Sequence, residues 1–476
     1  MKQKFTANIL FLVGINILIK PFYALAIDTS VQNIVGPEEY GLFLAIFNFV
    51  YIQQIFSDLG VQNFNNRDIS QNPEKLPQVL PKTLASKVLF SIAFVLITLF
   101  TSWIFGYLKY LESILIWVIG SQVSLSMLLY LRTNVSGSGR YFTDSFFSVL
   151  DKLILIIWMS YVIWGNPNVV DVTITYFVQV QFYSILITEI FVLFYTHKRL
   201  SPIHLHLDWS FVGSLLRESL PYATLIILMA GYSRLDGIML EQLLDDNARE
   251  AGEYARSFRL YDTFNNFMFL FAVLLLPMFS RMLKAGEDIN ALVLWAFRLL
   301  LFSSFFGVIM VYFHGTEILS FFYDAANEGV SHTFLWLMIA GVSLSLNYIY
   351  GTLLTANGNI KTLNGIAIVG FIINIVFNFV AIPKYGKEGA AGATAVTQTI
   401  VLIFQMYFCF QYFKLESPLK AVSKIILVGI ISVLLFFYFE TLTYIHFGTK
   451  ILIVGILSLG LAFIVGLIRR SDFKVV

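Results

Sequence analysis

The chain has 476 residues, of which 58% are hydrophobic and 13% charged, and its formal net charge is +2. Soluble domains carry about 25% charged residues, so this composition argues against a soluble protein and predicts a membrane protein. The small net charge gives no support for a nucleic-acid partner. The single cysteine, Cys409, excludes an intrachain disulfide and a cysteine-based metal site.

Apolar stretches long enough to cross a bilayer, about 20 residues each, recur along the whole chain. They predict an all-α membrane protein with about fourteen transmembrane helices and short polar connections. The helices are expected near 6–30, 40–60, 83–105, 111–132, 145–164, 171–195, 214–240, 254–280, 290–313, 331–355, 362–382, 388–412, 420–439 and 449–468.

The distribution of lysine and arginine predicts the orientation of these helices. With the N-terminus in the cytoplasm, 22 of the 31 basic residues fall in the cytoplasmic segments and five in the outer loops. We therefore expect both termini in the cytoplasm. The remaining four basic residues lie inside or at the ends of predicted helices: Lys20, Arg234, Arg256 and Arg259.

Two pairs of similar motifs indicate an internal duplication. IVGPEEYGLF (34–43) resembles AREAGEYARSF (248–258), and both place Glu-Tyr in an outer loop just before a helix. NVSGSGRY (134–141) and TANGNIKT (355–362) both follow the fourth helix of their half. Because each half contains six helices, an even number, both halves enter the membrane from the same side, which predicts a parallel repeat.

The duplication predicts that the chain has three parts. It also places two of the charged residues at equivalent positions in the two halves. Lys20 and Arg234 each lie 20 residues before the tyrosine of the outer-loop motif in their half, so each half places a cation at the same depth in its first helix. The expected parts are a six-helix lobe at 1–205, a second six-helix lobe at 206–415, and two further helices with a cytoplasmic tail at 416–476.

Polar side chains inside the predicted helices follow helical stripes. A charge near the bilayer centre costs about 2.5–3.5 kcal/mol, so these stripes should face away from lipid. We expect them to converge on a water-filled cleft between the halves, where repeat-built transporters bind their substrates. Besides the four cations, the residues expected to line this cleft or to pair with its charges are Asn48, Gln54, Asp58, Asp236, Asp262 and Asn266.

Two structural interpretations compete with a binding role for these charges. Each arginine could pair with a nearby aspartate, for instance Arg259 with Asp262, and so fasten helices together. Arg256 could instead extend its guanidinium to the outer membrane interface. Pairing alone leaves one cation in excess of the aspartates, which favours a role beyond pairing.

Five motifs, taken in chain order, carry a resemblance to a known family: VGPEEYGLF (35–43), RLDGIML (234–240), GEYARSFRLYD (252–262), LLLPMFSRM (274–282) and IPKYGKEGAAGATAVTQ (382–398). With these motifs the chain resembles, across essentially its whole length, the polysaccharide-biosynthesis branch of the multidrug/oligosaccharidyl-lipid/polysaccharide exporter superfamily. Within that branch it is similar to O-antigen-type flippases.

The resemblance implies a MATE-like pair of six-helix lobes with two extra helices. It also implies a cationic cavity that receives an undecaprenyl-pyrophosphate-linked oligosaccharide, with Lys20, Arg234, Arg256 and Arg259 as the substrate-binding cations. We expect a transporter rather than an enzyme, without cofactor or metal, in the bacterial inner membrane. Its expected partners are the lipid-linked oligosaccharide, membrane lipids, a coupling ion (H+ or Na+) and polysaccharide assembly proteins.

Three other functions remain open from the sequence. A multidrug or cation antiporter of the same superfamily would be expected to favour acidic cavity residues, against which Lys20 argues. A membrane glycosyltransferase or polymerase would need a sizeable outer loop with catalytic residues, and the predicted outer loops are short. A scaffold without transport would leave the charges of the cleft unexplained.

Overall fold

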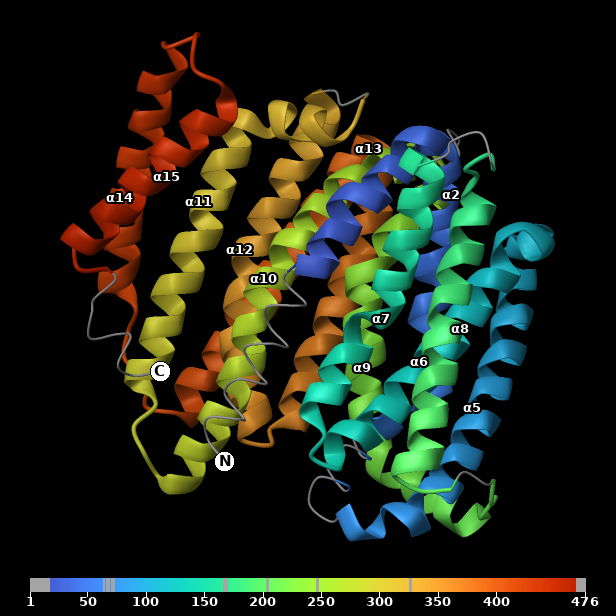
Figure 1. The fold of residues 1–476 in the computed structure, drawn as a ribbon. Helices are drawn as coiled ribbons and strands as arrows, with labels where there is room; N and C mark the ends of the chain where they lie inside the picture. The colour runs from blue at the N-terminus through green and yellow to red at the C-terminus, as the bar shows by residue number, and fades with distance from the viewer. Residues whose placement is uncertain are drawn as a thin grey trace. The chain divides into compact units, whose positions relative to one another are not determined.

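The computed structural model describes residues 18–62, 65, 69, 73–165, 170–202, 205–244, 248–324 and 328–467. This part of the chain is built from helices and contains no strand, which confirms the all-α fold. Twelve helical segments in it are long and apolar enough to cross a membrane. The chain is therefore a multi-pass membrane protein, and it folds as the two compact units described below (Figure 1).

The first unit comprises residues 1–242 and 246–252. Its helical elements are η1 (Tyr23–Asp28), α2 (Thr29–Gln53), α3 (Ile55–Asp58), η2 (Pro73–Lys75), α5 (Leu76–Ile104), η3 (Tyr107–Tyr110), η4 (Leu111–Leu115), α6 (Ile116–Gly137), α7 (Tyr141–Ser160), η5 (Tyr161–Gly165), α8 (Ile174–Arg199) and α9 (Trp209–Leu243). Helix α6 packs against α2, α3, α5, α7 and α8. The buried side chains Leu131 of α6, Leu80 of α5 and Leu215 of α9 share one apolar core.

The second unit comprises residues 243–245 and 253–476. Its helices are α10 (Arg249–Ala285, whose first turn belongs to the first unit), α11 (Asn290–Phe322), α12 (Glu328–Ala356), α13 (Ile360–Tyr412), α14 (Leu419–Glu440) and α15 (Phe447–Ile464). Helix α12 packs against α11 and α13, while α14 and α15 form a hairpin on α11 (Figure 1). Glu440 joins these three helices, because its carboxylate lies 3.2 Å from Lys450 Nζ and 3.2 Å from His314 Nε2.

Two of the twelve candidate spans are too long for a single straight crossing. They run over Leu18–Asp58 and Ile360–Tyr412, 41 and 53 residues, whereas about 20 residues cross the hydrocarbon. Each is broken by a glycine at positive φ, Gly36 (φ 82°) and Gly386 (φ 53°), a conformation that other residues rarely adopt. These breaks lie where the sequence predicts outer loops. The number of fourteen crossings stays a prediction.

Two stretches of the outer-loop motifs, residues 37–41 and 248–252, lie side by side in the first unit. A Cβ atom on Gly41 would collide with the carbonyl oxygen of Ala248, and one on Gly252 would collide with the carbonyl oxygen of Pro37. Backbones that approach this closely leave room only for hydrogen at the Cα atom. Gly41 and Gly252 are therefore required by packing.

Helix α9 belongs to the first packing unit although the sequence assigns it to the second lobe. Val212 and Leu215 enter the core of the first unit, and Gly237 lies against the side chain of Asn48. A packing unit and a duplicated segment are different divisions of a chain, so the predicted parts at 1–205, 206–415 and 416–476 remain predictions.

Candidate functional site

The polar stripe predicted on the second helix lies inside the first unit, but it is divided between two helices. Helix α2 ends at Gln53, and the short helix α3 follows after Gln54. Asn48 is 3% exposed, while Gln54 and Asp58 are half-buried. Gln54 Nε2 donates a 3.4 Å hydrogen bond to the carbonyl oxygen of Gln122 on α6. Gln54 therefore faces α6 within the unit, while Asn48 lies against Gly237 of α9.

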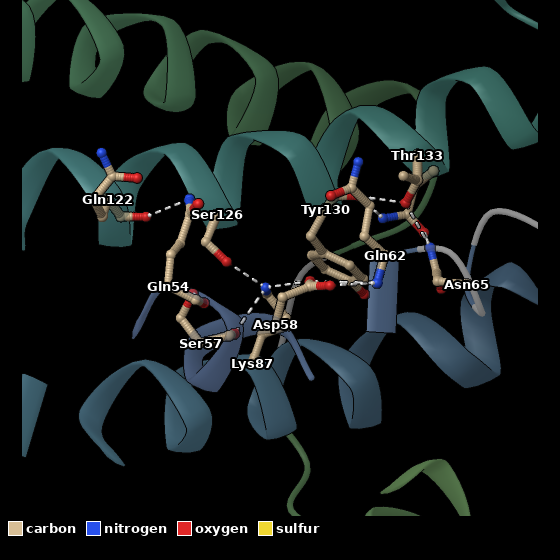
Figure 2. Close-up of polar contacts among 11 residues, drawn as sticks. Gln54, Ser57, Asp58, Gln62, Asn65, Lys87, Gln122, Ser126, Tyr130 and Thr133 are labelled. Atoms are coloured by element: carbon tan, nitrogen blue, oxygen red, sulfur yellow. Dashed lines mark hydrogen bonds and ion pairs between the residues drawn. The ribbon is translucent and has the colours of Figure 1, made fainter. Parts of the chain in front are cut away.

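Asp58 forms an ion pair with a lysine outside the predicted site (Figure 2). Lys87 of α5 is fully buried, and its Nζ atom lies 2.8 Å from Asp58 Oδ1, 2.9 Å from the carbonyl oxygen of Ser57 and 2.6 Å from Ser126 Oγ. An ammonium has three N–H donors, so each has an acceptor here. Asp58 also accepts a 3.3 Å hydrogen bond from the backbone N–H of Gln62. This arrangement joins α3, α5 and α6.

Further polar side chains continue this cluster along one face of α6 (Figure 2). Gln122, Ser126, Tyr130 and Thr133 follow one another at spacings of four, four and three residues, which places them on one stripe. Asn65 Nδ2 donates to Thr133 Oγ1 at 2.9 Å. Three buried oxygen atoms of this cluster take part in no hydrogen bond with any described residue: Gln122 Oε1, Tyr130 OH and Asn65 Oδ1. Buried polar atoms of this kind are the usual partners of internal water.

Lys20 has a different environment. It is exposed, and the charges that act on it come from Arg132 on α6 and from Asp151 and Lys152 on α7. Arg132 Nε lies 2.8 Å from Asp144 Oδ1, and Lys152 Nζ lies 3.4 Å from Asp151 Oδ2. We call Lys20, Arg132 and Lys152 the three-cation cluster. Each of the three belongs to a different membrane-spanning segment.

Arg234 and Asp236 lie on α9 at the predicted stripe of α2. The guanidinium carbon of Arg234 is 5.3 Å from the centre of the Tyr51 ring, a cation–π distance, and the side chain is half-buried. Asp236 is 1% exposed. The structure therefore places the cation of the seventh predicted helix beside the second one, within one unit.

The predicted stripe of α10 changes from buried to exposed along its length. Arg256 is 4% exposed, and its guanidinium carbon lies 5.5 Å from the centre of the Tyr323 ring just beyond the end of α11. Arg259 and Asp262 are half-buried, while Asn266 is exposed and donates a 2.8 Å hydrogen bond to the carbonyl oxygen of Asp262. The convergence of the charges of both halves on one cleft stays a prediction.

Sequence reasoning missed three cations of the first unit: Lys87, Arg132 and Lys152. The 22 basic residues that indicate the orientation of the helices include all three. Lys87 and Lys152 nevertheless lie inside predicted helices, and Arg132 lies at the last residue of one. A cation several residues inside a predicted helix is expensive unless protein surrounds it, and that signal could have added them to the candidates.

Chemical groups suited to a metal are lacking in the part of the chain that the structure describes. No three side chains of histidine, cysteine, aspartate or glutamate gather there at a distance that would hold a metal ion. The polar groups of the first unit are instead amides, hydroxyls and paired charges, which bind ions and polar head groups by hydrogen bonds and electrostatic attraction.

Comparisons with known proteins support the resemblance seen in the sequence. A family model described as "Polysaccharide biosynthesis protein" matches residues 5–283. An uncharacterized membrane protein of Methanocaldococcus jannaschii is 27% identical over 212 residues, which is 44% of this chain and 41% of that protein. The matched region therefore spans less than half of the relative.

Solved structures share the fold. The lipid II flippase MurJ in an inward closed conformation has a TM-score of 0.77 at 15% identity and covers 96% of this chain and 98% of its own. A multidrug resistance MATE family transporter of the MOP superfamily, in an inward-facing conformation, has a TM-score of 0.65 at 12% identity and covers 83% and 94%. Since the family model covers more than half of the residues, the chain belongs to the polysaccharide biosynthesis protein family.

Proposed function

We propose that this chain is a flippase that moves an undecaprenyl-pyrophosphate-linked oligosaccharide, an O-antigen or another surface polysaccharide unit, from the cytoplasmic to the outer leaflet. The observation that carries the proposal is membership of the polysaccharide biosynthesis protein family. The fold that the chain shares over 96% of its length with a lipid II flippase supports it. Transport proceeds by alternating access through a cationic central cavity.

The charges of the first unit suit an anionic cargo. A diphosphate cannot cross hydrocarbon unaided, because an ion that leaves water loses its hydration. Two unit charges attract each other about four times more strongly at an effective dielectric constant of 20 than in water. Lys20, Arg132, Lys152 and Arg234 all lie in membrane-spanning segments of this unit. The polyprenyl tail can stay in lipid while the head group passes these cations.

The cellular setting belongs to the same proposal. The chain acts in the bacterial inner membrane with both termini in the cytoplasm, as the excess of lysine and arginine in the predicted cytoplasmic segments indicates. A coupling ion, H+ or Na+, drives the cycle, and polysaccharide assembly proteins supply the substrate and receive it. The predicted cavity cations Lys20, Arg234, Arg256 and Arg259 contribute to head-group binding.

A multidrug antiporter is the second candidate, and the TM-score of 0.65 with a MATE family transporter favours it. Such a carrier of cations is expected to place carboxylates without lysine or arginine partners in its cavity. In the first unit Asp58, Asp144 and Asp151 are each paired with a lysine or arginine, while the buried Asp28 accepts hydrogen bonds from Gln32 and Tyr40. Transport of a cationic dye by the purified protein, without movement of lipid, would establish this candidate.

The test is a leaflet-resolved assay in proteoliposomes that contain the full-length protein and an undecaprenyl-pyrophosphate-linked oligosaccharide. A membrane-impermeant glycosidase outside the vesicles should cleave only the outer-leaflet pool in protein-free vesicles. With the protein present it should cleave nearly all of the substrate. Cleavage that stops at the outer-leaflet pool under imposed H+ and Na+ gradients would contradict the proposal, and release or transfer of sugar without the added enzyme would point to a glycosyltransferase.

A further inference from the structure

Three aromatic side chains of α2 form a row in the first unit. Phe43, Phe47 and Tyr51 follow one another at spacings of four residues, which places them on one stripe of the helix. The ring centres of Phe43 and Phe47 are 5.8 Å apart, and those of Phe47 and Tyr51 are 6.0 Å apart with planes inclined by only 21°. The row therefore runs along about two turns of α2.

The two ends of this row differ in burial. Phe43 is 4% exposed and packs edge to face on Phe177 of α8, with ring centres 6.1 Å apart. Phe47 and Tyr51 are half-buried, and we call their open part the Phe47–Tyr51 surface. The core of the unit therefore holds one end of the row and leaves the other end open.

Arg234 of α9 indicates that the open end faces a polar space and not lipid. It lies near the middle of the span Ala223–Leu243, and its side chain is half-buried. Its guanidinium carbon is 5.3 Å from the centre of the Tyr51 ring. A cation at this depth is costly when it faces acyl chains. Polar molecules therefore reach the Phe47–Tyr51 surface beside this guanidinium.

Close packing of α9 on α2 holds the arginine in this place. Gly237 follows Arg234 after one turn, and a Cβ atom on it would lie 2.7 Å from Asn48 Nδ2 and 3.5 Å from Leu44 Cδ2. Because glycine has no side chain, the backbone of α9 can approach α2 here. The contact of the guanidinium with Tyr51 is therefore built into the packing of the two helices.

This guanidinium limits which molecules fit the Phe47–Tyr51 surface. An open tyrosine face attracts organic cations, but here a fixed cation already lies over the ring and repels a second one. The neighbouring carboxylate of α9, Asp236, is 1% exposed and is not open to an incoming cation. A polyprenyl chain is better placed in lipid than beside a charge.

A neutral sugar ring fits both parts of the surface. The faces of a sugar ring carry C–H groups, which pack on the electron-rich face of an aromatic ring. Its rim carries hydroxyl groups, which are compatible with a charged neighbour. Binding sites for small molecules commonly combine aromatic walls with a few polar groups in this way.

We infer that the Phe47–Tyr51 surface binds a sugar ring of the lipid-linked oligosaccharide, and that Arg234 is a specificity-determining residue that keeps organic cations away from it. The sugar packs on the Phe47 ring beside the guanidinium, while Phe43 and Phe177 hold the row from the core. This inference rests on the proposed function and adds a contact for the glycan part of the substrate.

The test compares two lipids on the purified full-length protein in nanodiscs, undecaprenyl pyrophosphate with and without its oligosaccharide. The dissociation constant of the sugar-free lipid divided by that of the sugar-bearing lipid measures the contribution of the sugar, because both lipids share the tail and the phosphates. Phe47→Leu should lower this ratio by about two- to tenfold, as for the loss of one aromatic contact. Phe47→Tyr keeps an aromatic ring and should keep the ratio.

A matched control and a second variant separate the contact from a loss of folding. Phe100→Leu on α5 removes a ring that is 61% exposed and whose aromatic neighbour is Trp103 of the same helix. This control should have the ratio of the unchanged protein. If Phe47→Leu lowers the melting temperature, Tyr51→Leu takes its place with the same expected fall in the ratio.

Arg234→Gln tests the specificity. Without the guanidinium the Tyr51 ring is open to organic cations, so this variant should bind ethidium about threefold more tightly than the unchanged protein, or more. Arg234→Lys keeps the charge and should bind ethidium as the unchanged protein does.

Two results would overturn the inference. If the leucine variants at Phe47 and Tyr51 keep the ratio of the unchanged protein, the surface does not bind the sugar. If Arg234→Gln binds ethidium no more tightly than the unchanged protein, the arginine does not set the specificity. The proposed function is tested separately, because it stands or falls with flipping by the unchanged protein in the proteoliposome assay.

Discussion

Lys87 and Arg132 are cations of neighbouring helices in the same unit, and they differ in how many of their donors have an acceptor and in how exposed they are. The three donors of Lys87 meet three acceptors at 2.6 to 2.9 Å, and its side chain is fully buried. Arg132 uses one nitrogen, and its side chain is 19% exposed. A membrane protein thus contains saturated charges, whose donors all have acceptors and which hold helices together. It also contains unsaturated charges, which have donors left over and can bind a ligand.

Charges inside membrane helices can be classified by the number of acceptors that their donors meet. Depth and helical spacing select residues that cannot face lipid, but they do not separate structural pairs from binding groups. The number of acceptors for each donor does separate them, because an ammonium with three acceptors gains little from a fourth. Asp58, which the sequence predicts either to line the cleft or to pair with its charges, belongs by this measure to a structural pair.

The largest effect on stability is expected from Lys87→Ala. The change leaves the Asp58 carboxylate without its cation inside the protein, and breaking a buried ion pair in this way costs about 3–5 kcal/mol. Reversible unfolding in mixed micelles would measure the loss. Replacing both partners, with Lys87→Met and Asp58→Asn, should restore part of it. A loss of unfolding free energy below about 1 kcal/mol, the contribution of an exposed pair, would show that the Lys87–Asp58 pair is not structural.

A smaller loss is expected from Ser126→Ala. This change leaves the Asp58 pair intact and removes one acceptor of the Lys87 ammonium, the hydroxyl at 2.6 Å. An unsatisfied buried donor costs about 1–3 kcal/mol. The same unfolding measurement applies, and Ser121→Ala on the same helix, whose hydroxyl donates to the carbonyl oxygen of Trp117 one turn earlier, serves as the comparison. An effect as large as that of Lys87→Ala would mean that the serine does more than accept one hydrogen bond.

A still smaller change in stability, about 0–1 kcal/mol, is expected when Arg132→Gln is combined with Asp144→Asn, because replacing both partners removes the desolvation cost of the ions together with their attraction. The rate of lipid movement in the proteoliposome assay should nevertheless fall by about tenfold or more if one bidentate contact is lost. Loss of stability without loss of transport would reverse the assignment of this cluster.

The smallest effect concerns the Lys82–Asp208 pair and depends on pH. Hydrogen bonds from the Lys82 ammonium, the Ser210 hydroxyl and the Phe211 amide hold the pKa of Asp208 well below its ordinary value. Since the folded pKa is depressed, the stabilisation is complete above the unfolded pKa of about 3.9 and declines as the pH falls below it. Melting temperatures between pH 3 and 6, as an approximate range, would measure this decline.

Asp208→Asn should remove that part of the pH dependence. The asparagine variant should therefore lose less stability on acidification below about pH 4 than the unchanged protein. A pH dependence that is identical in the two proteins would show that the hydrogen bonds of Asp208 exist only weakly in solution.

Hydropathy predicted the last two helices of the chain closely. The predicted helices near 420–439 and 449–468 match α14 and α15 within a few residues at each end, because an apolar segment of this length has no other stable conformation in a bilayer. Gly36 and Gly386, where two long helices break, lie in predicted outer loops because polar residues and a proline surround each glycine.

Pairing between helices was not readable from the sequence. Asp58 and Lys87 are 29 residues apart and meet because α3 and α5 pack against each other. Arg256 lies buried against Tyr323, a residue 67 positions further along the chain, and its helical stripe does not reveal this partner. Spacing along one helix defines a face, and the partner of that face depends on tertiary packing.

The most direct measurement is an experimental structure of the full-length protein with undecaprenyl pyrophosphate bound. The account predicts that phosphate oxygens lie at about 3 Å from the Nη atoms of Arg132, close to Lys20 and Lys152, with Lys87 still paired to Asp58. A head group bound away from these three side chains, with Arg132 closed entirely onto Asp144, would contradict the distinction between saturated and unsaturated charges.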